Sequence, residues 1–567
     1  MRIVSFSTKI LTFLSFFLVS SCTDRDLDEV GRMGEQAMVV SAHPLASAVG
    51  ADILRRGGNA FDAAVAVEFA LAVVYPDAGN IGGGGFMVLR QHDGSIDALD
   101  YRETAPAAAH RDMYLDQEGN VIEGLSVSGH LAAGVPGTVD GMVQLHQKYG
   151  SMPWEALVQP AIDLAAQGFP LTAKEAAKFN KFRGDFLTYN TVKPDFALSY
   201  HWQAGDTIRF ADLAATLERI RDQGRSGFYE GKTADLIVAE MERGGGIITR
   251  EDLQHYSAVW REPLTSMYEG YKVIAMPPPS SGGIALIQLL TLSEDYPVAE
   301  WGWNTVEATH FMVEAERRVY ADRAAHLGDP AYYDVPVAEL LDEEYIRQRM
   351  ADFSPEKATD SDAVSAGQPV AYESTNTTHY SIVDPAGNAV SATTTLNSIF
   401  GAKVFVAGAG FLLNNEMDDF SIKPGYPNIY GLVGGEANAI SPGKRMLSSM
   451  TPTILEKDGK LLMVVGSPGG STIITTVYQT ILNVIEHGFP MQGAVNAGRF
   501  HHQWRPDWVL SEWGALGFGT ALKLWLKGHR VVPHTGTIGR VDAVLVWPDG
   551  RLEGGADPRG DDAAAGF

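Results

Sequence analysis

Three clusters in the sequence contain residues of the kinds used in catalysis, but each lacks a familiar pattern. The glycines at 82–85 lack the following Lys-Ser/Thr of a phosphate-binding loop. Ser467 does not have glycines two positions away on both sides, as a nucleophile elbow requires. His501 and His502 are adjacent, and adjacent side chains on a strand point to opposite faces, which suits one metal ion poorly. We therefore predict structural roles for both histidines and no metal site.

Thr377 is a threonine at a predicted strand edge, which taken alone is explained by β-propensity. Its surroundings single it out. Asn376–Ser381, followed by Gly387–Val390, resembles the processing site of the γ-glutamyltranspeptidases. Further motifs in that family's order and spacing cover nearly the whole chain from about residue 38 to 567: Gly82–Phe86, Asp100–Glu103, Pro279–Gly283, Thr395–Asn397, Asn414–Phe420, Pro442–Arg445, Ser448–Met450 and Gly466–Ser471. One departure is Met446, where the family often has proline.

The resemblance implies an α/β (α+β) fold, the αββα four-layer sandwich of N-terminal-nucleophile hydrolases, with mostly antiparallel sheets between helical layers. It also implies self-cleavage between Asn376 and Thr377, which would give a large subunit, 38–376, and a small catalytic subunit, 377–567, in one αββα unit. The chemistry is reasonable, because a threonine hydroxyl can attack the preceding carbonyl and water can release the resulting ester. The new N-terminal amine, with a pKa near 8, can then act as base for the same hydroxyl.

The other catalytic roles follow from the same resemblance. Thr395 resembles the second threonine that hydrogen-bonds the nucleophile. Gly469 and Gly470 resemble the oxyanion hole, where backbone N–H groups act as fixed dipoles. Read alone, these two glycines would be a turn before a helix.

The resemblance also implies a receptor for a zwitterionic γ-glutamyl group. A guanidinium fork and two hydroxyls would bind its α-carboxylate: Arg102, Ser448 and Ser449. Its α-ammonium would be bound by Asn397, Glu416 and Asp419. The segment Pro424–Gly435 resembles a lid, with Tyr430 as its gate.

The implied enzyme is a γ-glutamyltransferase and glutathione hydrolase without a cofactor. Its substrates would be glutathione and other γ-glutamyl compounds, and its acceptors would be water, amino acids or dipeptides. Two alternatives remain open: a related acylase of the glutaryl or cephalosporin type, and a catalytically silent surface lipoprotein.

Alternating and helical patterns predict the elements that must position these residues. Near the N-terminus we expect a buried helix capped by Asn59 and running to about Val74, followed by a hairpin of 86–89 with 96–101. Helices should dominate 140–350, including 153–167 and 305–325, with a strand at 271–276. Beyond Thr377 we expect strands 379–384, 389–395, 452–456 and 461–466, helix 471–487, and a strand at 540–546 that closes the sheet.

The N-terminus predicts export and lipid attachment. Lys9 precedes an apolar run too short to span a membrane as a stable helix, so 1–21 is predicted to be a signal peptide. Small residues before Cys22 resemble a bacterial lipobox, which makes 22–37 a lipid-anchored tether on the periplasmic or cell-surface side. The net charge of −25 disfavours nucleic acid as a partner.

Overall fold

The computed structural model describes residues 26–198, 201–364, 377–428, 431–432 and 434–567. Cys22, Asn376 and Tyr430 lie outside the described residues, as does the predicted signal peptide.

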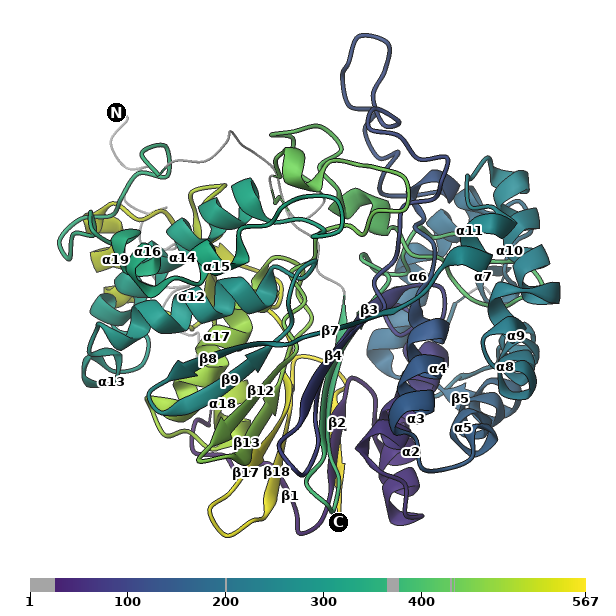
Figure 1. The fold of residues 1–567 in the computed structure, drawn as a ribbon, viewed down its shortest axis with the longest axis horizontal. Helices are drawn as coiled ribbons and strands as arrows, with labels where there is room; N and C mark the ends of the chain where they lie inside the picture. The colour runs from purple at the N-terminus through teal and green to yellow at the C-terminus, as the bar shows by residue number, and fades with distance from the viewer. Residues whose placement is uncertain (1–25, 199–200, 365–376, 429–430, 433) are drawn as a thin grey trace, which may run out of the picture.

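Two large antiparallel sheets lie face to face between two layers of helices, which confirms the predicted αββα sandwich (Figure 1). The first sheet has the order β1 (Arg32–Gly34), β18 (Leu552–Ala556), β17 (Asp542–Val546), β13 (Lys460–Val465), β12 (Thr453–Lys457), β9 (Tyr271–Ala275), β8 (Leu264–Tyr268). The second has the order β19 (Ala563–Gly566), β2 (Met38–Ser41), β10 (Thr378–Val383), β11 (Ala389–Thr395), β3 (Gly84–Arg90), β4 (Ile96–Asp100), β7 (Val259–Arg261).

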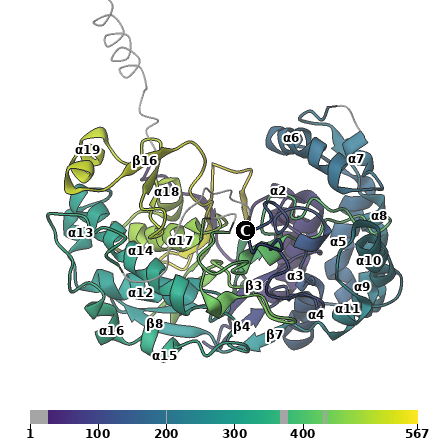
Figure 2. The ribbon, with the colours of Figure 1, turned by 90° about the horizontal axis from the view of Figure 1, so that it is seen from above.

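The helices divide between the two outer faces in chain order (Figures 1 and 2). Beside the second sheet lie α2 (Pro44–Arg55), α3 (Ala60–Val74), α4 (Thr138–Tyr149), α5 (Trp154–Gln167), α6 (Ala173–Tyr189), α7 (Asp195–Leu198), α8 (Ala211–Gln223), α9 (Ser226–Tyr229), α10 (Gly231–Gly244) and α11 (Arg250–His255). Beside the first lie α12 (Gly282–Glu294), α13 (Val298–Trp301), α14 (Val306–His326), α15 (Val337–Leu340), α16 (Glu343–Gln348), α17 (Thr472–Ile485), α18 (Met491–Asn496) and α19 (Phe518–Lys527).

The remaining elements are short. They are the 3-10 turns η1 (His130–Ala132), η2 (Glu416–Asp419) and η3 (Glu436–Asn438), the pair β5 (Phe169–Pro170) and β6 (Thr207–Ile208), and the small sheet of β14 (Phe500–His501), β15 (Val509–Glu512) and β16 (Val531–His534). The β15–β16 pair is parallel.

Strand alternation sends apolar side chains of the second sheet into two separate cores. Met87 and Leu89 of β3 pack toward the α2–α11 layer. Phe86 and Val88, one residue out of phase, pack into the other core with the first sheet and α12, α14 and α17. The second sheet is therefore buried on both faces.

Helix α3 forms as the sequence predicts. The Asn59 side chain accepts from the Asp62 amide, and the Asp62 carboxylate accepts from the Asn59 amide, which makes a capping box. All its residues are buried, including Glu68, which accepts a hydrogen bond from the Tyr380 hydroxyl at 2.9 Å. Burial raises the pKa of Glu68 to about 7.

One predicted element has the wrong place. The strand predicted at 540–546 does not close its sheet, because β18 pairs along the outer side of β17 and β1 follows β18. β18 contains two glycines, and β19 is three alanines and a glycine. Such residues have low β-propensity, so neither strand is visible in the sequence pattern.

Candidate active site

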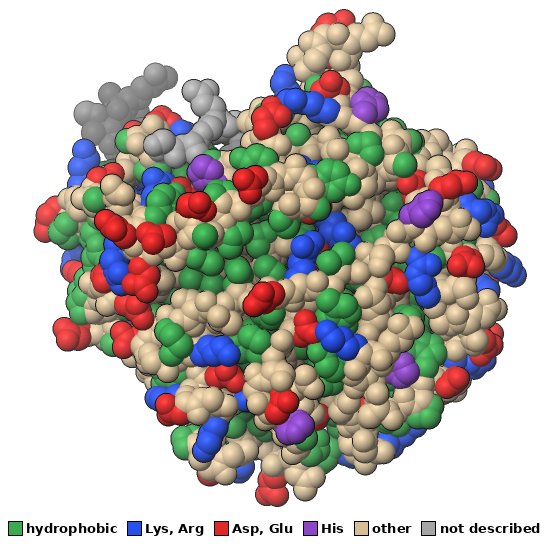
Figure 3. All heavy atoms as spheres, in the orientation of Figure 1, with side chains coloured by type: hydrophobic (Ala, Val, Ile, Leu, Met, Phe, Trp, Pro, Cys, Tyr) green, Lys and Arg blue, Asp and Glu red, His purple; other side chains and the backbone are tan. Residues whose placement is uncertain are grey.

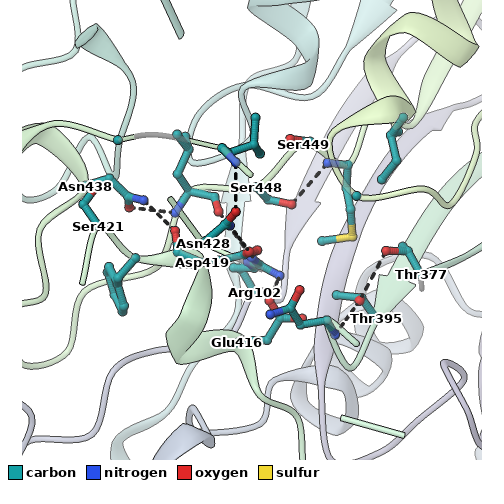
Figure 4. A pocket seen from close by; sticks show the side chains of 18 of the residues that line it. Arg102, Thr377, Thr395, Glu416, Asp419, Ser421, Asn428, Asn438, Ser448 and Ser449 are labelled. Atoms are coloured by element: carbon teal, nitrogen blue, oxygen red, sulfur yellow. Dashed lines mark hydrogen bonds and ion pairs between the residues drawn. The ribbon is translucent and has the colours of Figure 1, made fainter. Parts of the chain in front are cut away.

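Thr377 and Thr395 meet because two neighbouring strands of the second sheet have a fixed register. β10 pairs antiparallel with β11, with Thr378 opposite Thr394, so Thr377 comes next to Thr395. The two side-chain oxygens are 3.4 Å apart, and Thr395 Oγ1 also accepts from the Asn397 amide at 2.7 Å. Thr377 is only 5% exposed. The predicted nucleophile is thus held at the end of a buried strand, beside its predicted partner (Figure 4).

The same register places polar side chains behind the two threonines, between the sheets. His379 Nδ1 lies 2.8 Å from Thr393 Oγ1, and His379 Nε2 lies 3.1 Å from Ser381 Oγ. Ser381 Oγ–H donates to the Asp542 carbonyl in the first sheet, so it accepts from His379 Nε2–H. Nδ1 must then accept from the Thr393 hydroxyl. Burial lowers the pKa of His379 to about 3, so the imidazole is neutral.

The predicted oxyanion glycines lie where β13 turns into α17. Gly469 has φ +141° and Gly470 has φ +57°, conformations that side chains other than glycine rarely adopt. A Cβ on Gly469 would come within 2.4 Å of Thr472 Oγ1. Gly470 lines the same pocket as Thr377, just before the N-terminus of α17, where backbone N–H groups favour negative charge.

The pocket beside Thr377 contains a dense group of charges around Arg102 (Figure 4). Its guanidinium lies 2.6 Å from Glu416, 2.5 Å from Asp419 and 3.6 Å from Glu103. Arg102, Glu103 and Glu416 are almost fully buried. The sequence places a cation at one end of the receptor and anions at the other, whereas the structure puts Arg102 in direct contact with both carboxylates. A buried guanidinium needs counter-charges, which explains the contact.

Three carboxyl groups share this one guanidinium, and their pKa values show the imbalance. Burial, only partly offset by Arg102, raises the pKa of Glu103 to about 8 and raises those of Glu416 and Asp419. For Arg102, burial alone would lower the pKa, but the surrounding carboxylates outweigh burial and raise it. Three carboxyl groups therefore surround the one guanidinium of Arg102, and Arg323 is a second cation that lines this pocket and favours the charged form of Asp419.

Ser448 and Ser449 line the same pocket (Figure 4). Arg323, on α14, donates to Ser449 Oγ at 3.1 Å and to Ser281 Oγ at 2.9 Å. Sequence reasoning missed Arg323, because α14 buries many charged residues and nothing in its pattern distinguishes this one.

Two asparagines near Asp419 were also missed. Asn428 Nδ2 donates to Asp419 Oδ1 at 3.1 Å, and Asn438 Nδ2 donates to the Asp419 carbonyl at 2.6 Å. The position of Asn428 within the predicted lid segment 424–435 was the one feature of the sequence that could have indicated its place near the site. Both contacts fix the orientation of Asp419.

The predicted residues converge on one pocket. It is lined by Arg102, Thr377, Thr395, Asn397, Glu416, Asp419, Ser448, Ser449 and Gly470. Gly469 precedes Gly470 in the same turn, whereas Asn376 and Tyr430 lie outside the described residues.

The adjacent histidines have separate partners. His501 is bonded to Thr475 and Gln503, each at 2.8 Å, and His502 is bonded to Asp507. Elsewhere in the described chain, potential ligand atoms of His310, Glu314 and His529 lie within 4.8 Å of one another. Those groups are hydrogen-bonded already, His310 to His529 at 2.6 Å and Glu314 to Arg318 at 2.8 Å.

Comparison with known proteins identifies the family of this chain. The family described as Gamma-glutamyltranspeptidase matches residues 46–567. This chain belongs to the γ-glutamyltranspeptidase family. It is 47% identical over 541 residues to the glutathione hydrolase proenzyme of Escherichia coli K12, covering 94% of this chain and 92% of that protein. It is 48% identical to the corresponding proenzyme of Pseudomonas aeruginosa, covering 90% and 91%.

Two solved structures are similar to this chain. The cephalosporin acylase of Bacillus halodurans superposes with a TM-score of 0.81 at 27% identity, covering 95% of this chain and 97% of that one. The γ-glutamyltranspeptidase of Helicobacter pylori has a TM-score of 0.56 at 42% identity, covering 60% and 96%.

Proposed function

We propose that this member of the γ-glutamyltranspeptidase family cleaves itself between Asn376 and Thr377 and then hydrolyses γ-glutamyl amides such as glutathione. The observation that supports this best is the position of Thr377 and Thr395 at the wall of a pocket that contains Arg102 and a cluster of carboxyl groups. The Thr377 hydroxyl can attack an amide, and Arg102 and the carboxyl groups can bind the charged groups of an amino acid.

The charge balance of the pocket supports a substrate with an ammonium group. Glu416 and Asp419 share the Arg102 guanidinium, and burial raises the pKa values of both carboxyls. Arg323 also lines the pocket, so a substrate α-ammonium would supply a further cation, and its α-carboxylate could bind Ser448, Ser449 and Arg102. A γ-glutamyl group carries both charges on one carbon.

The reaction we propose has two steps. The Thr377 hydroxyl attacks the γ-carbonyl while its proton passes to the α-amine of Thr377, and Thr395 Oγ1 hydrogen-bonds the nucleophile. Backbone N–H groups at Gly469 and Gly470 stabilise the oxyanion, and the amine of the leaving group takes up the proton. Water, an amino acid or a dipeptide then attacks the γ-glutamyl ester and regenerates Thr377.

An acylase is the second candidate function, because the chain is also 36% identical to the acylase ACY 1 proenzyme of a Pseudomonas species over 93% of both lengths. Identity to the glutathione hydrolase proenzymes is higher. A glutaryl group lacks the ammonium, so it would leave Asp419 and Glu416 without the added cation. We therefore favour the γ-glutamyl substrate.

The decisive experiment combines gel electrophoresis with kinetics. The wild-type chain should give two fragments that meet at Thr377 and should hydrolyse a γ-glutamyl anilide, faster when glycylglycine is an acceptor if transfer competes with hydrolysis. Thr377→Ala should remain a single inactive chain. Cleavage of Thr377→Ala at the same bond would rule out the mechanism, and an intact wild-type chain would favour the catalytically silent alternative.

We also propose that Cys22 is lipid-modified after removal of 1–21, so that the enzyme sits at a membrane on the exported side. No helix among the described residues is long and apolar enough to cross a bilayer. Cys22→Ser should leave the specific activity unchanged and abolish incorporation of labelled palmitate.

A further inference from the structure

Helix α19 carries an apolar face that is exposed in the described part of the chain. The exposed apolar residues of α19 are spaced so that they lie on one side of the helix, whereas Leu524 on the opposite side is completely buried. The exposed side chains on α19 and in the turn before it, with their exposed fractions, are Trp513 (65%), Phe518 (80%), Leu522 (45%), Trp525 (64%) and Leu526 (69%). Large apolar side chains gathered on a surface mark an interaction site.

The charge of this segment is opposite to that of the whole protein. The chain has a net charge of −25, and Figure 3 shows acidic side chains spread over one face of the molecule. Residues 513–530, by contrast, contain no Asp or Glu but contain Lys523, Lys527 and Arg530. Lys523 and Arg530 are exposed. Aromatic and leucine side chains beside basic ones are typical of helices that lie in a membrane interface.

The apolar face lies near the point where the described chain begins. Asn496, at the end of α18, donates to the Asp26 carbonyl at 3.2 Å and to Glu29 at 2.7 Å. Three residues later, the Arg499 carbonyl accepts from the Glu512 amide at 3.0 Å, and Trp513 follows Glu512. Asp26 is four residues after Cys22, so a lipid attached there would hold this side of the molecule at the bilayer.

We propose that α19 is a membrane-docking helix, with its apolar face in the headgroup region of an anionic bilayer and its basic residues at lipid phosphates. A second copy of the chain fits the face less well, because a two-fold contact would bring the same basic residues together. In Figure 2, α19 lies at the upper left edge, away from the green segment around 416–443 that borders the pocket. Docking through α19 therefore leaves the pocket open to water.

The test uses the full chain with vesicles of phosphatidylethanolamine and phosphatidylglycerol that contain nitroxide-labelled lipid. A fluorophore on Leu526→Cys should be quenched. The matched control is Met267→Cys on β8, another exposed apolar side chain at 56% exposure, which should be quenched little. Both proteins retain Cys22, so its contribution is the same in each. Equal quenching of the two reporters would overturn the proposal.

A second arm measures binding without a label. In the Cys22→Ser background, Phe518→Ser with Trp525→Ser should lower vesicle partition by about ten-fold, since two aromatic side chains no longer enter the interface. Tyr332→Ser with Met267→Ser is the control and should leave partition unchanged. Rising salt should weaken binding of the parent protein.

Two results would contradict docking on lipid. One is equal partition of the α19 and control variants. The other is a dimer that the α19 variant dissociates without any change in vesicle binding, which would make this face an interface between copies. Anilide hydrolysis and self-cleavage should be unchanged in all variants, so failure here is distinct from failure of the proposed catalytic function.

Discussion

Under the proposed function, Asp419 is the residue that binds the substrate ammonium group. Arg102, Asn428 and Asn438 hold it in place, and burial raises its pKa. A glutaryl substrate would not offer it a cation. Wild type should therefore favour γ-glutamyl over glutaryl anilide by roughly 30- to 1000-fold in kcat/KM, or about 2–4 kcal/mol.

Asp419→Asn should narrow this preference and sharply reduce γ-glutamyl turnover, because the substituted side chain keeps its shape and loses its charge. Self-cleavage should continue, since it needs no bound substrate, and it serves as the control for folding. The measurement is kcat/KM for matched anilides on both proteins. Equal hydrolysis of the two anilides by wild type would favour the acylase alternative.

His379 should act on catalysis by positioning Thr377, two residues before it on β10. Its hydrogen bonds to Thr393 and Ser381 link β10 to β11 and, through the Asp542 carbonyl, to the first sheet. His379→Asn should lower kcat by about ten-fold with little change in KM, because the substrate pocket itself is untouched. Thr393→Val, which removes the donor to Nδ1, should act in the same direction more weakly. A raised KM at unchanged kcat would argue against positioning.

At the scale of elements, the contact between α3 and β10 predicts a pH-dependent stability. The pKa of Glu68 is about 7 in the folded protein, against 4.5 for an ordinary glutamate, so the folded state binds a proton that the unfolded state releases. That stabilisation is complete below pH 4.5 and is lost as the pH rises through 7. Relative to wild type, Glu68→Gln should therefore gain about 3 kcal/mol between roughly pH 4.5 and 8.

Denaturant unfolding of wild type and Glu68→Gln across this pH range measures the difference between their free energies of unfolding. The contributions of the other titrating groups are the same in both proteins and cancel in this difference. Glu118→Gln, which makes the same substitution at an exposed carboxylate, is the control. If the difference in unfolding free energy between Glu68→Gln and wild type did not change with pH, Glu68 would be ionised in the folded protein.

The local sequence pattern predicted the helices and strands whose own residues include caps, turns or alternating side chains. Helix α3, the hairpin of β3 and β4, and the β10–β11 hairpin all appeared in the sequence as capping residues, turns and alternating side chains. Strands β18 and β19 could not be predicted, because their small residues become strands only by pairing with distant ones.

The candidate site shows the same division. Family motifs predicted nine of the residues that line the pocket, including Arg102 and Asp419. They did not predict the direct contact between these two, nor the reach of Arg323 from α14 to Ser449. Both depend on how separate segments pack, and no spacing in the sequence records that.

At the scale of the whole molecule, both sheets contain strands from before and after Thr377, which pair directly with one another. In the second sheet β10 and β11 lie between β2 and β3, and in the first sheet β12 pairs with β9 while β18 pairs with β1. After cleavage, the two chains should therefore remain together and unfold in one step.

Denaturant titration followed by spectroscopy and by size-exclusion chromatography measures this directly. Loss of secondary structure and separation of the two chains should have the same midpoint. Uncleaved Thr377→Ala is the control, since its two parts cannot separate. Release of the small chain at a denaturant concentration that leaves the spectra native would show that the sheets do not hold the chains together.

The position of β19 also determines when the second sheet can be completed during synthesis. β19 pairs with β2, and the carbonyl of Phe567 accepts hydrogen bonds from the Gln36 and Ala37 amides. Because β2 is also the neighbour of β10, the sheet that carries Thr377 is complete only when β19 has been made. Since a chain is synthesised at about 5–20 residues per second, β19 is made on the order of half a minute or more after β2. The edge of the sheet that carries Thr377 therefore depends on a distant segment: a chain that stopped before β19 would lack the strand that pairs with β2 on the side away from β10.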